Sequence, residues 1–215
     1  EEIVLTGAGS RDKWSEHNAE LAAAYAFNAA KGAKALVVDV SAESPSIAAH
    51  AALGVRLASY RFDKYRTKPA PDARQTLAAV RLVTRDPARA AKALKSLEGL
   101  AEGIFIARDL VSEPANVLYP AEFARRVKAL SRVGLKVEVL GEREMEKLGM
   151  GALLGVGQGS RRESQLAILQ WKGAKNPKAA PVAFVGKGVC FDTGGISLKP
   201  SDRLEEMIID MAGAA

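Results

Sequence analysis

Short β-rich runs alternate along the chain with stretches whose apolar residues recur at helical spacing. The predicted strands are residues 3–7, 36–40, 80–84, 135–140, 165–171 and 182–185. The predicted helices are residues 14–31 with Ser15 as N-cap, 46–58, 120–132, 142–148 and a long stretch from Pro87 toward Val111. This order is typical of an α/β protein whose sheet is mixed, mostly parallel and covered by helices.

Two α/β alternations follow each other along the sequence. A Pro-Ala-Pro run at residues 69–71 interrupts the first, and the helix that begins at Pro87 precedes the second. We expect a smaller N-terminal α/β domain at residues 1–86, a connecting helix at 87–103 and a C-terminal α/β/α domain at 104–215. The chain opens without a methionine and stops inside an Ala-rich stretch, so we expect it to be cut at both ends.

The composition is that of a globular protein, with 48% hydrophobic and 26% charged residues. It excludes disordered, collagen-like and coiled-coil chains. No run of about 18 apolar residues occurs, so we expect no membrane span. Cys190 is the single cysteine, which rules out an internal disulfide and favours a reducing compartment, the cytoplasm.

Basic residues outnumber acidic ones by 31 to 25, which gives a net charge of +6. The excess is spread evenly, with one local concentration that we call the basic cluster and that is interleaved with aromatic residues. It consists of Arg56, Arg61, Lys64, Arg66, Lys68 and Arg74. Two interpretations stay open for it: a solvated face or subunit contact, and a nucleic-acid or anion site.

Four other features have structural interpretations beside functional ones. Residues 155–160 carry three glycines but run into a turn and a strand, so a permissive turn fits better than a phosphate loop. His17 and His50, the only histidines, form no zincin or Ser-His-Asp motif. Cys190 has no histidine nearby and indicates a buried structural thiol. Residues 113–116 indicate a loop that positions the next helix.

The most informative segment is residues 185–200 together with Asp210. It places Lys187, Asp192, Lys199 and four glycines just beyond a predicted buried strand, where an open sheet presents groups to a ligand. Carboxylates beside an uncharged amine suit divalent Zn, Mn, Co or Mg, and one aspartate can bridge two ions about 3.5–4 Å apart. A second interpretation stays open from these residues alone, a salt-bridged turn at the end of a strand.

Residues 187–197, 199–200 and 210–215 closely resemble the first metal-site signature of the leucyl (cytosol) aminopeptidase family. Further matches occur in the order that the family has them, at residues 9–13, 108–116 and 149–160. The resemblance covers nearly the whole chain, and several separated matches in family order are hard to reconcile with coincidence.

The resemblance implies a site and an activity. Lys187, Asp192 and Asp210 would be ligands of a centre of two divalent metal ions, Mn or Zn, with Asp192 touching both. Lys199 would be the catalytic lysine, protonated to polarise the scissile carbonyl. The expected activity is metal-dependent removal of N-terminal residues, leucine and similar, from peptides with a free N-terminus by an activated hydroxide. The family further implies a cytoplasmic homohexamer.

The chain also departs from the family pattern. The family's second motif, Asn-Thr-Asp-Ala-Glu-Gly-Arg, supplies the remaining metal ligands and does not occur in these 215 residues. We therefore expect half a metal site and no peptide hydrolysis by this chain alone. The alternative is a non-catalytic family member that binds nucleic acid, or regulates, through the basic cluster.

Overall fold

The computed structural model describes most of the chain. The described residues are 3–30, 32–68, 77–176 and 178–215. Two parts of the sequence-based expectations, the Pro-Ala-Pro interruption and Arg74 of the basic cluster, lie outside them.

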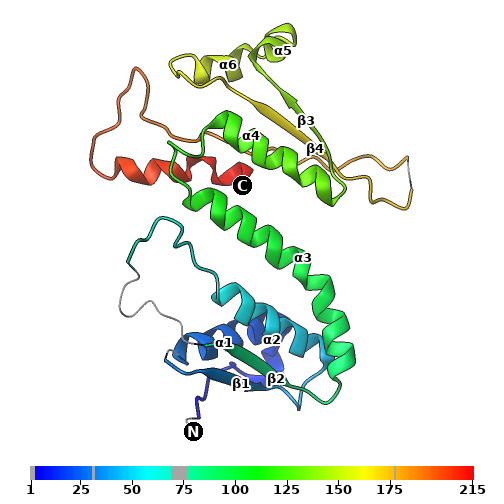
Figure 1. Cartoon of the computed structure of the whole chain (residues 1–215). Helices are drawn as coiled ribbons and strands as arrows, with labels where there is room; N and C mark the ends of the chain where they lie inside the picture. The colour runs from blue at the N-terminus through cyan, green and yellow to red at the C-terminus, as the bar shows by residue number, and fades with distance from the viewer. Residues whose placement is uncertain (1–2, 31, 69–76, 177) are drawn as a thin grey trace. The chain divides into compact units, whose positions relative to one another are not determined.

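The chain divides into two compact units, Glu1–Ile106 and Ala107–Ala215, whose elements are labelled in Figure 1. The division falls inside one long helix, α3 (Pro87–Ser112), so each unit contains part of that helix. The long helix predicted from Pro87 is confirmed. The domain boundaries at residues 86 and 103 stay a prediction.

The first unit contains a parallel pair of strands. Strand β1 (Ala35–Asp39) pairs with β2 (Ala79–Val83), with Ala35 opposite Ala79 and Asp39 opposite Val83. Helix α1 (Glu16–Ala29) precedes β1 and follows the short 3-10 turn η1 (Arg11–Lys13), and helix α2 (Pro45–Ala58) connects the two strands. The predicted helices and parallel strands of this region are confirmed to within a few residues.

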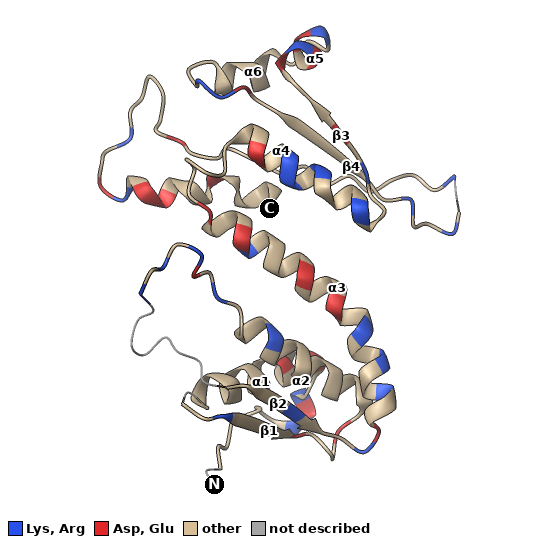
Figure 2. Cartoon of the chain, in the orientation of Figure 1, with Lys and Arg blue, Asp and Glu red and all other residues tan. Residues whose placement is uncertain are grey.

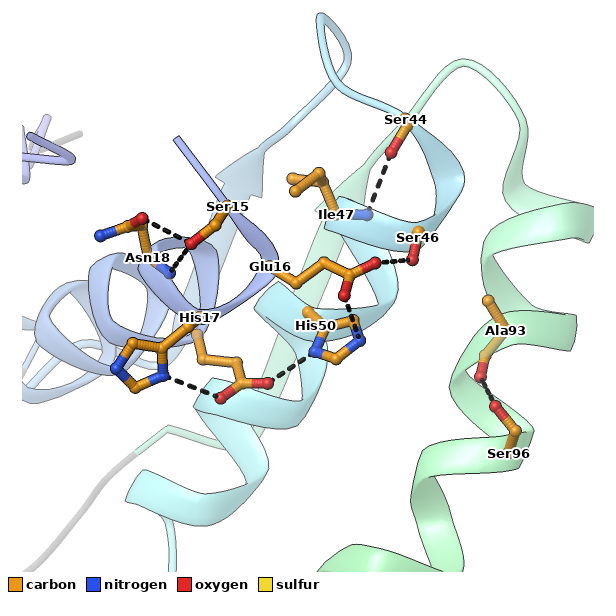
Figure 3. A network of polar contacts seen from close by, with 11 residues as sticks. Ser15, Glu16, His17, Asn18, Ser44, Ser46, Ile47, His50, Ala93 and Ser96 are labelled. Atoms are coloured by element: carbon orange, nitrogen blue, oxygen red, sulfur yellow. Dashed lines mark hydrogen bonds and ion pairs between the residues drawn. The ribbon is translucent and has the colours of Figure 1, made fainter. Parts of the chain in front are cut away.

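Each of these two helices begins at a serine whose hydroxyl accepts a backbone N–H. The oxygen of Ser15 accepts from the amide of Asn18, and that of Ser44 accepts from the amide of Ile47 (Figure 3). Such N-caps satisfy amide groups that have no partner within the first turn of a helix. The predicted N-cap at Ser15 is therefore confirmed.

Small side chains allow α1 and α2 to pack closely. Ala19 and Ala23 of α1 form a core cluster with Ala51 and Val55 of α2, and each of these side chains is buried. At Gly54 the approach is so close that an added Cβ would collide with the backbone carbonyl oxygen of Glu20 in α1. Only glycine allows this distance between the two helices.

The second unit combines short helices with an antiparallel pair of strands. After α3 come α4 (Pro120–Ala129), the 3-10 turn η3 (Leu130–Val133), β3 (Lys136–Leu140), α5 (Glu142–Lys147), α6 (Gly151–Gly157), β4 (Leu166–Gln170) and the 3-10 helix η4 (Leu204–Ala214). β3 and β4 are antiparallel, with Lys136 opposite Gln170 and Leu140 opposite Leu166. With one parallel and one antiparallel pair, the architecture is mixed α/β, as predicted.

Three elements differ from expectation. Gly155–Gly157 belong to α6, so the interpretation of that stretch as a turn is wrong for these residues. Residues 3–7 and 182–185 adopt no strand in the described part of the chain. A strand requires a neighbour for its backbone hydrogen bonds, and Phe184 and Val185 are instead 94% and 98% exposed.

Among the described residues, no helix has both the length and the apolar character needed to span a membrane. This agrees with the absence of a long apolar run in the sequence.

Candidate metal centre

The structure brings together the four side chains that the sequence singled out. Nζ of Lys199 lies 2.9 Å from Oδ2 of Asp192 and 3.6 Å from Oδ2 of Asp210. Nζ of Lys187 lies 3.0 Å from Oδ1 of Asp210. Two carboxylates and two amines, drawn from positions up to 23 residues apart, thus form one group. We call these four residues the candidate centre.

Buried residues next to the two aspartates explain how the chain holds them in place. Cys190, two positions before Asp192, and Met211, directly after Asp210, belong to one hydrophobic cluster. The other members are Leu110 at the end of α3, Leu118 and Phe123. Burying apolar side chains is the main stabilising contribution to folding, so this cluster fixes both aspartate-bearing segments against α3 and α4.

Two glycines allow the segment around Lys187 to lie against the end of η4. An added Cβ at Gly186 would collide with the carbonyl oxygen of Gly213. An added Cβ at Gly213 would lie 3.4 Å from the backbone nitrogen of Lys187, which is tighter than most such contacts. The close approach of the two backbones brings Lys187 within reach of Asp210.

A tight loop presents Asp192 and Lys199 to each other. The amide of Gly194 donates to Oδ1 of Asp192 at 2.9 Å, and the amide of Lys199 donates to the carbonyl of Thr193 at 2.9 Å. Gly194 has φ +97°, and a Cβ there would collide with the carbonyl oxygen of Ser197. The loop therefore needs glycine at this position for both conformation and space.

Asp192 and Lys199 each stabilise the charge of the other. Hydrogen bonding from Lys199, and next from the amide of Gly194, lowers the pKa of Asp192 below its usual value. Hydrogen bonding to Asp192 raises the pKa of Lys199. An ammonium held charged in this way can polarise a carbonyl, and an ionised carboxylate can bind a cation.

Asp210 carries the clearest sign of room for a cation. Its Oδ2 is buried and has no hydrogen-bond partner among the described residues, and the 3.6 Å to Nζ of Lys199 is too long for a hydrogen bond. A buried carboxylate oxygen is costly unless a donor or a metal ion satisfies it. Two carboxylates with a deprotonatable amine suit Mn²⁺ or Zn²⁺, so the donor set fits a divalent metal.

The donor set is small. Within the described ranges, no group of three or more His, Cys, Asp or Glu side chains could hold a metal ion. The candidate centre offers two carboxylates, Asp192 and Asp210, and relies on the amine of Lys187 for a further donor. Sequence reasoning also missed Met207 of η4, whose sulfur accepts from Nζ of Lys199 at 2.9 Å, because a lone methionine carries no recognisable motif.

The two histidines have structural contacts in the first unit. Nδ1 of His50 lies 2.5 Å from Oε1 of Glu20, and its Nε2 lies 3.6 Å from Oε2 of Glu16 (Figure 3). Nδ1 of His17 lies 3.7 Å from Oε2 of Glu20. His50 thus links α2 to α1, and His17 pairs within α1, in line with the structural interpretation.

Cys190 and Arg56 also have local explanations. Burial raises the pKa of the Cys190 thiol to about 11, which leaves it unreactive and supports its structural interpretation.

Arg56 of the basic cluster pairs with Glu102 of α3 and lies 6.0 Å from the centroid of the Phe105 ring. No contact in the described part of the chain favours nucleic-acid binding by this cluster.

Comparison with protein families identifies the chain. The catalytic domain of the cytosol aminopeptidase family matches residues 105–215, and the N-terminal domain of the same family matches residues 1–69. The chain belongs to the cytosol aminopeptidase family. The resemblance predicted from the residues around Lys187 and Asp192 is confirmed.

Curated relatives from two bacteria extend the match. The chain is 54% identical to the "probable cytosol aminopeptidase" of Caulobacter vibrioides and 49% identical to that of Rhodopseudomonas palustris. The alignments cover 99% of this chain but 43% and 44% of the relatives. The chain therefore spans less than half the length of these family members.

Solved structures show the same fold. A tomato leucine aminopeptidase mutant is 27% identical and has a TM-score of 0.77, with 97% of this chain and 41% of that chain covered. The bottromycin maturation enzyme BotP in complex with Mn is 32% identical and has a TM-score of 0.74, with 97% and 44% covered. These structures confirm the predicted α/β fold class.

Proposed function

We propose that this chain contributes half of a two-metal centre to an aminopeptidase that removes N-terminal residues, leucine and similar, from peptides. One observation carries the proposal: in a domain of the cytosol aminopeptidase family, three ion pairs of 2.9–3.6 Å connect Lys187, Asp210, Lys199 and Asp192. The names of the relatives, among them a leucine aminopeptidase and an enzyme in complex with Mn, support both the activity and the metal.

The residues of the candidate centre divide into ligands and a polarising group. Asp192, Asp210 and the deprotonated amine of Lys187 would hold the metal ions, Mn or Zn. When bound, such ions act as Lewis acids and lower the pKa of water. Lys199 would stay protonated beside Asp192 and donate a hydrogen bond to the scissile carbonyl oxygen, where negative charge develops.

The proposed centre needs further ligands. Zinc and manganese bind more donors than two carboxylates and one amine supply to a pair of ions. A segment that carries additional carboxylates would complete the centre, and we propose that these 215 residues alone do not hydrolyse peptides. The natural polypeptide would act in the cytoplasm as a homohexamer, in keeping with the family.

The first experiment measures the hydrolysis of leucine anilides by the natural polypeptide, with Mn²⁺ or Zn²⁺ added. Lys187→Ala and Asp192→Ala are each expected to lower the metal-dependent rate by at least about 100-fold, because each would remove a ligand. Lys172→Ala, an exposed lysine outside the candidate centre, is the matched control and should leave the rate unchanged. Retention of metal-dependent activity by both ligand variants would show that the assignment of roles is wrong.

A further inference from the structure

The end of α3 and the beginning of α4 form a corner that is held by ion pairs. Glu113 follows α3, is 3% exposed, and has its Oε2 2.8 Å from Nη1 of Arg126 in α4. Arg126 also donates through Nε to Oε1 of Glu122 at 2.8 Å. Glu113 is the one buried charged residue in the described part of the chain. Since a buried carboxylate is stable only with such partners, Arg126 contributes to holding the corner together.

The same corner carries the hydrophobic cluster that supports the candidate centre. Leu118, 1% exposed, lies between Glu113 and α4 in the sequence, and Phe123 lies on α4 itself. Both side chains pack in one cluster with Cys190 and Met211. These two residues stand beside the aspartates of the candidate centre, so the position of α4 governs where both aspartates lie.

The segment that carries Lys187 also runs close to α4. An added Cβ at Gly188 would lie 3.8 Å from Cε1 of Phe123, which is ordinary van der Waals distance. The backbone next to Lys187 therefore runs close to the ring of Phe123, with space between them that a methyl group would fill. Phe123 is three residues before Arg126, so the two side chains lie on neighbouring turns of the same helix face.

Figure 2 shows that α4 carries acidic and basic residues together. Arg125 and Arg126 both donate to Glu122, and these hydrogen bonds lower the pKa of Glu122 to about 2. The two arginines differ in exposure and in partner. The side chain of Arg125 is 70% exposed and pairs on its own helix. The side chain of Arg126 is 25% exposed and also pairs with Glu113. Arg126 alone of the two links α4 to the end of α3.

We infer that the Glu113–Arg126 ion pair is a positioning device for the proposed metal centre. It sets where α4 lies and, through Phe123 and the cluster with Cys190 and Met211, where Lys187, Asp192 and Asp210 lie. The pair itself touches neither metal nor substrate. This inference rests on the proposed function, because the positioned groups are the proposed ligands.

The test measures Mn²⁺ affinity of the metal-free protein from the electron paramagnetic resonance signal of the free ion. Glu113→Gln and Arg126→Gln are each expected to weaken binding about tenfold, the lower end of what supporting residues around metal sites cost. Arg126→Lys keeps the charge and should weaken binding less than Arg126→Gln. Arg125→Gln, the matched control on the same helix, should leave the affinity unchanged.

A second control separates positioning from general stability. Met145 in α5 is fully buried and lies outside the cluster of the corner, so Met145→Ala destabilises the second unit without touching Glu113. We expect it to lower the unfolding temperature at unchanged Mn²⁺ affinity. Hydrogen exchange of metal-free protein should speed up at residues 186–192 in Glu113→Gln but not in Met145→Ala. Equal weakening of Mn²⁺ binding by both variants would overturn the inference.

The outcome for Asp192→Asn distinguishes this inference from the proposed function. If Asp192→Asn weakens Mn²⁺ binding and neither Glu113→Gln nor Arg126→Gln does, the positioning role is wrong and the proposed metal centre stands. If Asp192→Asn binds Mn²⁺ as well as the unchanged protein does, the proposed centre is wrong and the positioning role falls with it.

Discussion

Ion pairs in this chain shift the pKa values of the carboxylates that they contain. Asp192 and Lys199 are each about one-third exposed, and they hold each other charged at the candidate centre. Glu122 lies between two arginines on α4, and hydrogen bonds from both lower its pKa to about 2. A lowered carboxyl pKa links the stability of the fold to pH, since the unfolded chain binds the proton first.

This linkage predicts how acid acts on Glu122→Gln. The folded pKa of Glu122, about 2, lies below its ordinary 4.5, so its stabilising contribution is complete above pH 4.5 and is lost as the pH falls toward 2. We expect Glu122→Gln to lower the free energy of unfolding by about 1 kcal/mol at neutral pH, because solvent screens the exposed Arg125. Urea titrations across this range should show the difference shrink toward zero. A difference that does not change with pH would contradict the assigned cause.

For single residues, the sequence predicted the members of the candidate centre better than the residues that hold them in place. Lys187, Asp192, Lys199 and Asp210 could be singled out because their residue types and neighbours form a recognisable pattern. Arg126 could not be singled out from sequence. Its importance comes from its ion pair with Glu113, which lies 13 residues earlier and is buried. Pairing and burial are tertiary properties that no short pattern carries.

Among the helices, α1 and α2 depend on their spacing more than on their individual sequences. Small residues line their contact, and Gly54 lies against the backbone of Glu20. Gly99 in α3 provides a contrast, because an added Cβ there would meet nothing within 4 Å. The two positions are both helical glycines, and only their surroundings differ.

Alanine at these two glycines is predicted to have opposite effects. Gly54→Ala must push α1 and α2 apart and should destabilise the fold by about 1–3 kcal/mol, the usual cost of overpacking. Gly99→Ala should stabilise it by up to about 1 kcal/mol, since alanine favours an exposed helix over glycine. Differential scanning calorimetry of the two variants tests this. A stabilising Gly54→Ala would show that the helices separate without cost.

Periodicity predicted the helices and strands that find partners in the described structure. The parallel strands β1 and β2 and the capped helices α1 and α2 agree with it to within a few residues. Residues 182–185 have a strand-like sequence and form no strand in the described structure, because apolar character favours a strand only where a neighbour supplies hydrogen bonds. In α6 the glycines masked a helical pattern.

The chain as a whole consists of two units with separate cores. One cluster centres on Phe27 and Val55 of the first unit, and the other on Leu118 and Met211 of the second. Alternating strands and helices predicted two α/β regions from sequence. The structure divides inside α3, and the sequence shows no composition change within this continuous helix that would mark such a boundary.

Separate cores predict separate responses to a core substitution. Leu53 in α2 is 2% exposed, and Leu53→Ala should destabilise the first unit by about 2–5 kcal/mol. Hydrogen exchange followed by mass spectrometry should then show faster exchange in α1 and α2 and no change in β3 and β4. Equal acceleration in both units would mean that the two unfold as one cooperative body.

The bare apolar run at residues 182–185 has a practical consequence for handling the chain. Phe184 and Val185 are almost wholly open to water, and no charged side chain lies within that run. Extended segments of this kind adhere to one another edge by edge, and sulfate or phosphate buffers strengthen the tendency. Dilute samples in weakly salting-out buffer, or a lysine placed at Ala183, would keep the polypeptide dispersed.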